Sequence, residues 1–180
     1  MAWPRRCTKA PFSLTPDTGF FFRNDAHVEA LQVLRVALDA GEGFIKVTGE
    51  VGTGKTLLCR MLLNSLDEQW VTAWVPNPYL DPDALRRAIA DELRVALGPT
   101  PRQHTLVKKL QERLIELAAS GKRVAVIIDE AQALSDESLE ALRLLSNLET
   151  ETRKLLHVVL FGQPELDERL ARPQLRQLRQ

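Results

Sequence analysis

Short apolar runs alternate with longer stretches in which hydrophobic residues recur every three or four positions. The short runs are rich in β-branched residues and predict buried strands at 44–48, 71–75, 124–128 and 155–161. The longer stretches predict amphipathic helices at about 25–40, 56–66, 82–97, 106–120 and 136–147. Repeated alternation of strand and helix is typical of a parallel sheet with helices on both faces, so we predict an α/β three-layer sandwich.

Capping residues refine several helix boundaries. Asn24 or Asp25 is expected to cap the first helix, Asp81 the third and Ser135 the fifth. Gly98, followed by a proline, is expected to end the third helix.

Composition fits one domain in a reducing compartment. The 180 residues are 44% hydrophobic, which is enough for a single sizeable core. The 24 basic and 24 acidic residues balance, so no global field attracts nucleic acid or an anionic membrane. Two cysteines, Cys7 and Cys59, are too few for a disulfide framework. No apolar run approaches the roughly 18 residues of a membrane span, and the N-terminus lacks a signal-peptide core, so we expect a cytoplasmic chain without a membrane segment.

The segment 49–56 has the spacing of a phosphate-binding loop, G-x-x-x-x-G-K-T, between a predicted strand and a predicted helix. Its glycines allow the tight curl that aims successive backbone N–H groups at phosphate oxygens. Lys55 is expected to reach the β and γ phosphates of ATP, and the Thr56 hydroxyl to ligate Mg²⁺. The predicted nucleotide-binding residues are Gly49, Glu50, Val51, Gly52, Thr53, Gly54, Lys55, Thr56 and Leu57. The alternative is a glycine-rich turn with a surface lysine.

Two carboxylates follow the third predicted strand, and a glutamine follows the fourth. Carboxyl ends of parallel strands gather at one edge of a sheet, where the phosphate loop also begins. Asp129 therefore suits the Mg²⁺ shell, and Glu130 suits polarisation of the attacking water. Gln163 is predicted to reach the γ phosphate, with a simple turn residue before Pro164 as the alternative.

Four arginines lie within the last twelve residues, which contain no carboxylate: Arg169, Arg172, Arg176 and Arg179. Such a cluster is typical of a solvated face or a positive helix end. The functional alternative is an arginine offered to the γ phosphate of a neighbouring subunit, for which Arg176 and Arg179 are the candidates.

Four segments together resemble the AAA+ ATPases of the general secretion pathway protein A family, with its MSHA pilus branch as the nearest likeness. They are the phosphate loop, the run 128–132 (IDEAQ), the stretch 142–150 (LRLLSNLET) and the run 162–166 (GQPEL). The resemblance implies a P-loop NTPase core in which Gly49 to Thr56 form the Walker A loop, Asp129 and Glu130 the Walker B pair, and Gln163 the sensor-one residue. It also implies a last core strand and a helical lid that this sequence lacks, so we expect residues 23–180 to be a C-terminally truncated ATPase core behind an N-terminal arm at 1–22. Pro11, Phe12 and the phenylalanines at 20–22 resemble a segment that lies against adenine, or they pack the arm onto the core.

The resemblance further implies Mg²⁺-dependent ATP hydrolysis that drives assembly of a type IV pilus or type II secretion apparatus at the cytoplasmic face of the inner membrane. The expected partners are ATP or ADP, further copies of the chain, and pilus or secretion assembly proteins. Two alternatives stay open: a transposition-type ATPase that binds duplex DNA, and a nucleotide switch whose output is partner binding.

Overall fold

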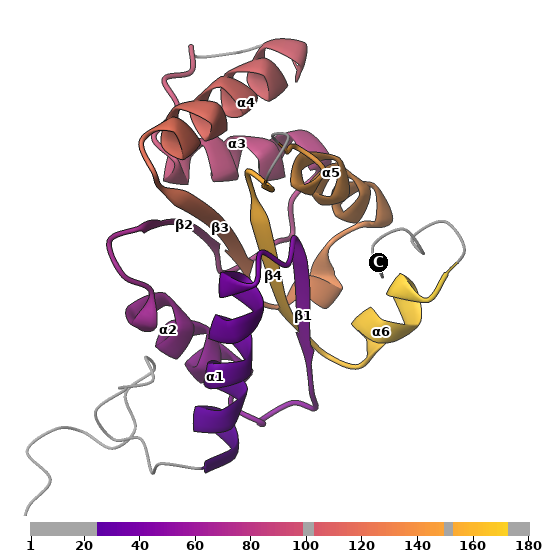
Figure 1. Cartoon of the computed structure of the whole chain (residues 1–180). Helices are drawn as coiled ribbons and strands as arrows, with labels where there is room; N and C mark the ends of the chain where they lie inside the picture. Colours follow the sequence, from indigo (N-terminus) through magenta and orange to yellow (C-terminus); the bar gives the residue numbers. More distant parts are fainter. Residues whose placement is uncertain (1–24, 99–102, 150–152, 173–180) are drawn as a thin grey trace, which may run out of the picture.

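In the computed structural model, residues 25–98, 103–149 and 153–172 are described, and they form a parallel sheet between two layers of helices (Figure 1). The strands are β1 (Phe44–Thr48), β2 (Trp70–Val75), β3 (Arg123–Ile128) and β4 (His157–Gly162). Their order across the sheet is β1-β4-β3-β2, and every neighbouring pair is parallel. The predicted parallel α/β architecture is therefore confirmed.

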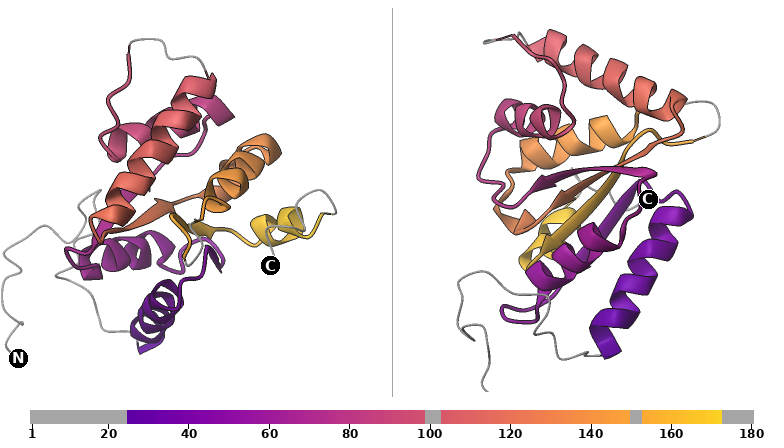
Figure 2. Two further views of the ribbon diagram at one scale, coloured as in Figure 1. Left: turned by 45° about the horizontal axis from the view of Figure 1, so that its top comes forward. Right: turned by 90° about the vertical axis from the view of Figure 1, so that its left-hand side faces the viewer.

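Helices cover both faces of this sheet, as Figure 2 shows from the side. On one face lie α1 (Asp25–Asp39) and α2 (Lys55–Ser65). On the other lie α3 (Pro82–Glu92), α4 (Gln103–Ala119) and α5 (Asp136–Ser146). The short helix α6 (Glu165–Leu170) follows β4, and a 3₁₀ turn, η2 (Ala131–Ala133), follows β3.

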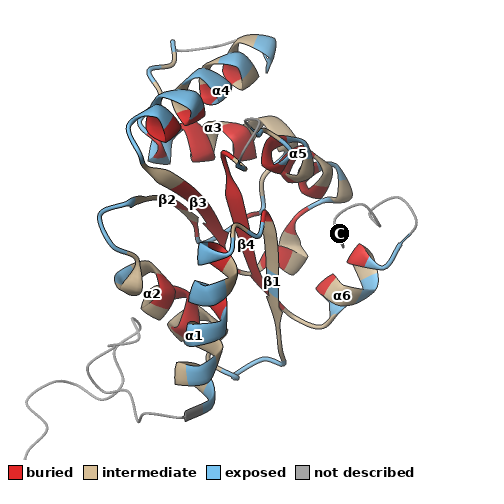
Figure 3. Cartoon of the chain, viewed as in Figure 1, coloured by how far each residue is buried: buried red, intermediate tan, exposed pale blue. Residues whose placement is uncertain are grey.

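The two central strands are buried on both faces, which explains their continuous hydrophobic character (Figure 3). Val126 and Val158 pack into the core under α3, α4 and α5, whereas the next residues along the strands, Ile127 and Val159, pack against α1 and α2. This alternation follows from the period of two in a strand. Burial of both faces holds β3 and β4 at the centre and fixes where their carboxyl ends lie.

The predicted end of the third helix is wrong. Helix α3 ends at Glu92, five residues earlier than expected, because Arg94 takes the left-handed conformation with φ 56°. The Val95 N–H then donates to the Ala90 carbonyl at 2.8 Å, and the Arg94 N–H donates to the Asp91 carbonyl at 3.0 Å. This is the Schellman arrangement, in which glycine is the usual left-handed residue. An arginine in that position gives no sequence signal.

Other boundaries agree with the capping residues. Asp81 accepts hydrogen bonds from two backbone N–H groups at the start of α3, and Ser135 accepts one at the start of α5. Asn24 lies outside the described residues. The fourth strand begins at His157 rather than at Leu155, because the Leu155 N–H donates to the Leu148 carbonyl at 2.9 Å instead of joining the sheet. Leu155 is nevertheless buried, which is why its hydrophobicity resembles that of a strand residue.

His157 is a packed core residue. Its side chain is 4% exposed, its Nδ1–H donates to the Glu42 carbonyl at 2.8 Å, and its ring meets the Trp70 ring edge-on with centroids 5.4 Å apart. Burial lowers the pKa of His157 from its ordinary 6.5 and outweighs the opposite effect of the hydrogen bond to the Glu42 carbonyl, and the nearby charges of Arg123 and Lys154 also lower it. The folded chain therefore holds this imidazole neutral.

We expect the free energy of unfolding to decrease as the pH falls below the ordinary histidine pKa. In that range the unfolded chain binds a proton that folded His157 resists, so protonation favours the unfolded state. The measurement is the urea midpoint between pH 7.5 and 5.5. Replacing His157 with Gln should flatten this dependence, whereas His104→Gln on the exposed face of α4 should leave it unchanged. Parallel pH profiles for wild type and His157→Gln would contradict this account.

Candidate functional site

The carboxyl ends of the strands bring the predicted site residues to one edge of the sheet. The Gly49 N–H, just after β1, donates to the Gly162 carbonyl at the end of β4, with N and O 3.2 Å apart. The Asp129 N–H, just after β3, donates to the Val75 carbonyl at the end of β2 at 3.1 Å. The phosphate loop, the acidic pair and Gln163 therefore begin from backbone positions that hydrogen bonds fix relative to the sheet.

The phosphate loop curls through two left-handed glycines. Gly52 has φ 83° and Gly54 has φ 84°, a conformation that residues with a Cβ rarely adopt. Inside the loop, the Thr53 hydroxyl and the Thr53 N–H both donate to the Glu50 carbonyl, at 2.8 and 3.3 Å. These bonds close the turn, and α2 begins directly after it at Lys55.

His27 of α1 supports this loop from outside, a contact that the sequence did not indicate. Its Nε2–H donates to the Thr53 carbonyl at 2.9 Å. A Cβ atom on Gly54 would lie only 2.6 Å from the same Nε2. Gly54 is therefore required for its backbone conformation and for the close approach of His27.

The start of α2 has the donor set of an anion site. Gly54, its N-cap, provides no side-chain cap, so the N-terminal N–H groups of α2 face the loop at the positive end of the helix. The Lys55 Nζ donates to the Gly49 and Glu50 carbonyls, each at 2.7 Å. An ammonium group that already lies against the loop, beside uncapped helix N–H groups, fits a phosphate chain.

Asp129 is buried directly after the end of β3. It is 4% exposed, and its Oδ1 accepts a hydrogen bond from the Glu130 N–H at 2.9 Å. Burial and, after it, the negative charge of Asp129 raise the pKa of the Cys59 thiol of α2 to about 12. The carboxylate is therefore close enough to α2, the helix that carries Thr56, for its charge to act on Cys59. A carboxylate and a hydroxyl are oxygen ligands of the kind that Mg²⁺ takes in proteins, so the residues present fit that ion.

Glu130 is held in an unusual conformation at the start of η2. Its φ is 52° and its ψ is 38°, the left-handed region that is uncommon for residues other than glycine. Its Oε2 accepts a hydrogen bond from the Gln132 Nε2 at 2.5 Å and a longer one from the Gln163 Nε2 at 3.5 Å. Left-handed residues of this kind cluster at functional sites when surrounding contacts hold them in place. The predicted pair Glu130 and Gln163 lie within hydrogen-bond distance, and Gln132, to which the sequence assigned no role, joins them.

Arg169 on α6 is an internal anchor and not part of a solvated face. It donates to both the Asp136 carboxylate and the Gln132 carbonyl, the latter at 2.8 Å, and its side chain is 18% exposed. Arg172 is more exposed and donates to the same Asp136 at 3.2 Å. These hydrogen bonds lower the pKa of Asp136 from its ordinary value. The candidate arginines Arg176 and Arg179 lie outside the described residues.

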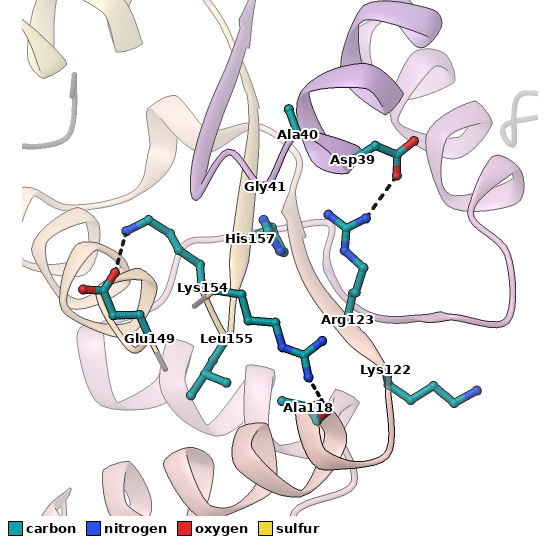
Figure 4. Close-up of a pocket in the computed structure, with 11 residues that line it drawn as sticks. Asp39, Ala40, Gly41, Ala118, Lys122, Arg123, Glu149, Lys154, Leu155 and His157 are labelled. Atoms are coloured by element: carbon teal, nitrogen blue, oxygen red, sulfur yellow. Dashed lines mark hydrogen bonds and ion pairs between the residues drawn. The ribbon is translucent and has the colours of Figure 1, made fainter. Parts of the chain in front are cut away.

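A polar cavity of about 560 Å³ lies at the opposite end of the sheet, where β3 and β4 begin (Figure 4). Its basic side chains lie at helix ends: Arg123 donates to the Leu38 carbonyl and to Asp39, the last residue of α1, and Arg153 donates to the Ala118 carbonyl of α4. Lys154 pairs with Glu149 at 3.6 Å. Cations at helix C-termini are stabilising, so the basic side chains of this cavity have a structural explanation. We therefore place the candidate functional site at the phosphate loop and not in this cavity.

Fold and site together define a P-loop ATPase of the AAA+ class. Residues 38–170 match the family model described as "AAA domain", and the chain belongs to that family. It is 43% identical over 173 residues to General secretion pathway protein A of Aeromonas hydrophila, an alignment that covers 96% of this chain and 32% of the relative. The chain thus spans about a third of that relative. The predicted resemblance is confirmed at this level, and the match does not single out the MSHA branch.

Two solved structures show the same fold. Cdc6p from Pyrobaculum aerophilum superposes with a TM-score of 0.71 at 19% identity, over 87% of this chain and 44% of that one. The ORC2 protein of Aeropyrum pernix, solved as ADPNP–ADP complexes, gives 0.60 at 18% identity, over 87% of this chain and 46% of that one. Within the described residues, no helix is both long and apolar enough to cross a membrane.

Proposed function

We propose that the chain binds ATP with Mg²⁺ and hydrolyses it at the edge of the sheet where β1, β3 and β4 end. The observation that carries the proposal is the convergence there of the phosphate loop with Glu130 and Gln163, whose side chains share one hydrogen bond. The ORC2 protein, which shares this fold, was solved with ADPNP and ADP bound, and that is consistent with this choice of ligand.

Each residue has a role that its position supports. The N–H groups of the loop and of the start of α2, with Lys55, would bind the phosphates. Thr56 and Asp129 would hold Mg²⁺, which when bound neutralises charge on the phosphate oxygens. Glu130 would accept the proton of the attacking water, and Gln163 would contact the γ phosphate.

In the cell, this hydrolysis drives assembly of a secretion apparatus or a type IV pilus at the cytoplasmic face of the envelope. The support is the identity of 43% with General secretion pathway protein A. Energy from hydrolysis would be used through conformational change between copies of the chain. Arg176 and Arg179 are the candidates to reach the γ phosphate bound to a neighbouring copy.

The test is the rate of phosphate release from ATP, measured for the purified chain with Mg²⁺ or with excess EDTA. Duplex DNA is then titrated at physiological salt. We expect Mg²⁺-dependent release that DNA leaves unchanged. Stimulation by DNA that saturates and disappears as salt rises would instead support the DNA-binding alternative, since counterion release makes such binding salt-sensitive. No release above the EDTA control would refute the hydrolase assignment for this chain.

A further inference from the structure

Gln132 lies at the centre of the hydrogen bonds that connect the ends of β3 and β4. It belongs to η2, two residues after Glu130, and it is partly buried. Its Nε2 donates to the Glu130 Oε2 at 2.5 Å, and its Oε1 accepts from the Gln163 N–H at 3.1 Å. One amide group therefore bridges two residues that are 33 positions apart in the sequence.

The chemistry of the two partners determines how this amide is oriented. An ionised carboxylate only accepts hydrogen bonds, and a backbone N–H only donates them. A side chain in this place must offer a donor to Glu130 and an acceptor to Gln163 at the same time. Glutamine does both, whereas glutamate has no donor when ionised and methionine has no amide.

The backbone around Gln132 leaves room for this arrangement and holds it. A Cβ atom on Gly162 would lie 3.2 Å from the Gln132 Oε1 and 2.8 Å from the Leu166 Cδ2, so glycine permits the close approach of the amide. On the other side, Arg169 donates to the Gln132 carbonyl at 2.8 Å while it pairs with Asp136 of α5. The turn is therefore anchored to α5 and α6 as well as to the sheet.

The two amides that meet Glu130 do so unequally. The Gln132 contact is short at 2.5 Å, and the Gln163 contact, at 3.5 Å, is at the limit of a hydrogen bond. The Gln163 side chain can therefore turn toward a γ phosphate at little cost. Gln132 would meanwhile keep its hydrogen bonds to the Glu130 carboxylate and to the Gln163 backbone N–H.

We propose that Gln132 is a positioning residue for ATP hydrolysis: its amide fixes the Glu130 carboxylate relative to the main chain of Gln163. The proposal rests on the proposed function of this site. It goes further by assigning to Gln132 the coupling between the residue that contacts the γ phosphate and the residue that activates water. In this role Gln132 acts through Glu130 and Gln163 rather than directly on the nucleotide or the water.

The decisive variants are Gln132→Met, which keeps the length of the side chain without its hydrogen bonds, and Gln132→Glu, which keeps the acceptor but places a second carboxylate beside Glu130. We expect each to lower kcat by about 10- to 100-fold and to raise KM by no more than about tenfold, because misplacement of a catalytic group by about 1 Å has effects of this size on rate. Gln111→Met, on the exposed face of α4, is the matched control and should leave both constants unchanged.

A second readout does not depend on turnover. Affinities for ADP and for a non-hydrolysable ATP analogue are measured by fluorescence, together with the thermal midpoint. In Gln132→Met we expect unchanged ADP affinity and about a three- to tenfold loss for the analogue, since only the analogue has a γ phosphate for Gln163 to contact. An unchanged ratio of the two affinities would overturn the proposal. So would an equal loss for both nucleotides with a lower thermal midpoint, which indicates a purely structural role. If wild type does not hydrolyse ATP, the proposed function fails, and the affinity ratio still decides the role of Gln132.

Discussion

Replacing Glu130 with Gln is expected to slow ATP turnover by about 100-fold or more while ATP affinity stays within about threefold. A general base contributes about 10²- to 10⁴-fold to rate, and an amide cannot accept the proton of the attacking water. The shape of the site should persist, because the new side chain keeps an oxygen that can accept the hydrogen bonds from Gln132 and Gln163. The measurement is phosphate release at saturating Mg²⁺-ATP, paired with the dissociation constant of a fluorescent ATP analogue.

Glu112→Gln is the matched control, since Glu112 is exposed on α4 and pairs with Lys108 at 3.8 Å, away from the site. It should leave both turnover and affinity unchanged. Unchanged turnover in Glu130→Gln would refute the role of this carboxylate and favour the nucleotide switch, in which hydrolysis is only a slow reset. Loss of turnover together with loss of ATP binding would indicate that Glu130 supports the phosphate loop rather than the water.

Hydrophobic pattern predicts the strands of this fold well, because β3 and β4 are buried on both sides and apolar residues therefore fill most positions. The hydrophobic pattern fails where a residue is buried but its backbone does not pair with the sheet. Leu155 is buried, but its backbone pairs with Leu148 and not with the sheet, so hydrophobicity alone assigned it to a strand. The pattern also fails where a helix ends without the usual glycine. Arg94 takes the left-handed conformation that ends α3, although this conformation favours glycine.

The residues of the site also differ in how far the sequence could predict them. Lys55, Thr56 and Asp129 stand next to local signals, a glycine-rich loop and a strand end, so sequence spacing is enough to propose them. Gln132 and His27 act through contacts with residues 31 and 26 positions away. Such contacts depend on which strand ends meet, and that depends on the order β1-β4-β3-β2. Topology is fixed by the packing of the whole sheet, so no short segment of the sequence encodes these partners.

Lys55 makes two hydrogen bonds inside the loop with which a bound phosphate would compete. Its ammonium group donates to the Gly49 and Glu50 carbonyls at 2.7 Å each, so it stabilises the curl of the loop. To replace these two carbonyl acceptors, a phosphate chain must form stronger hydrogen bonds with the ammonium group. It can do so because phosphate is negatively charged, and hydrogen bonds between charged groups are stronger than those to a neutral carbonyl. The same group would therefore stabilise the loop and bind phosphate.

Replacing Lys55 with Ala is accordingly expected to weaken Mg²⁺-ATP binding by about 10- to 150-fold, the effect of losing about 1.5 to 3 kcal/mol from hydrogen bonds to a charged group. The thermal midpoint should change little, because the lost loop contacts are exposed or only partly buried. Lys55→Arg should not restore affinity, since a planar guanidinium does not replace a compact ammonium in a tight loop. Lys108→Ala, whose side chain is 76% exposed on α4, is the control. Equal ATP affinity in Lys55→Ala and Lys108→Ala would mean that residues 49–56 are only a glycine-rich turn between β1 and α2, and the nucleotide site would have to lie elsewhere.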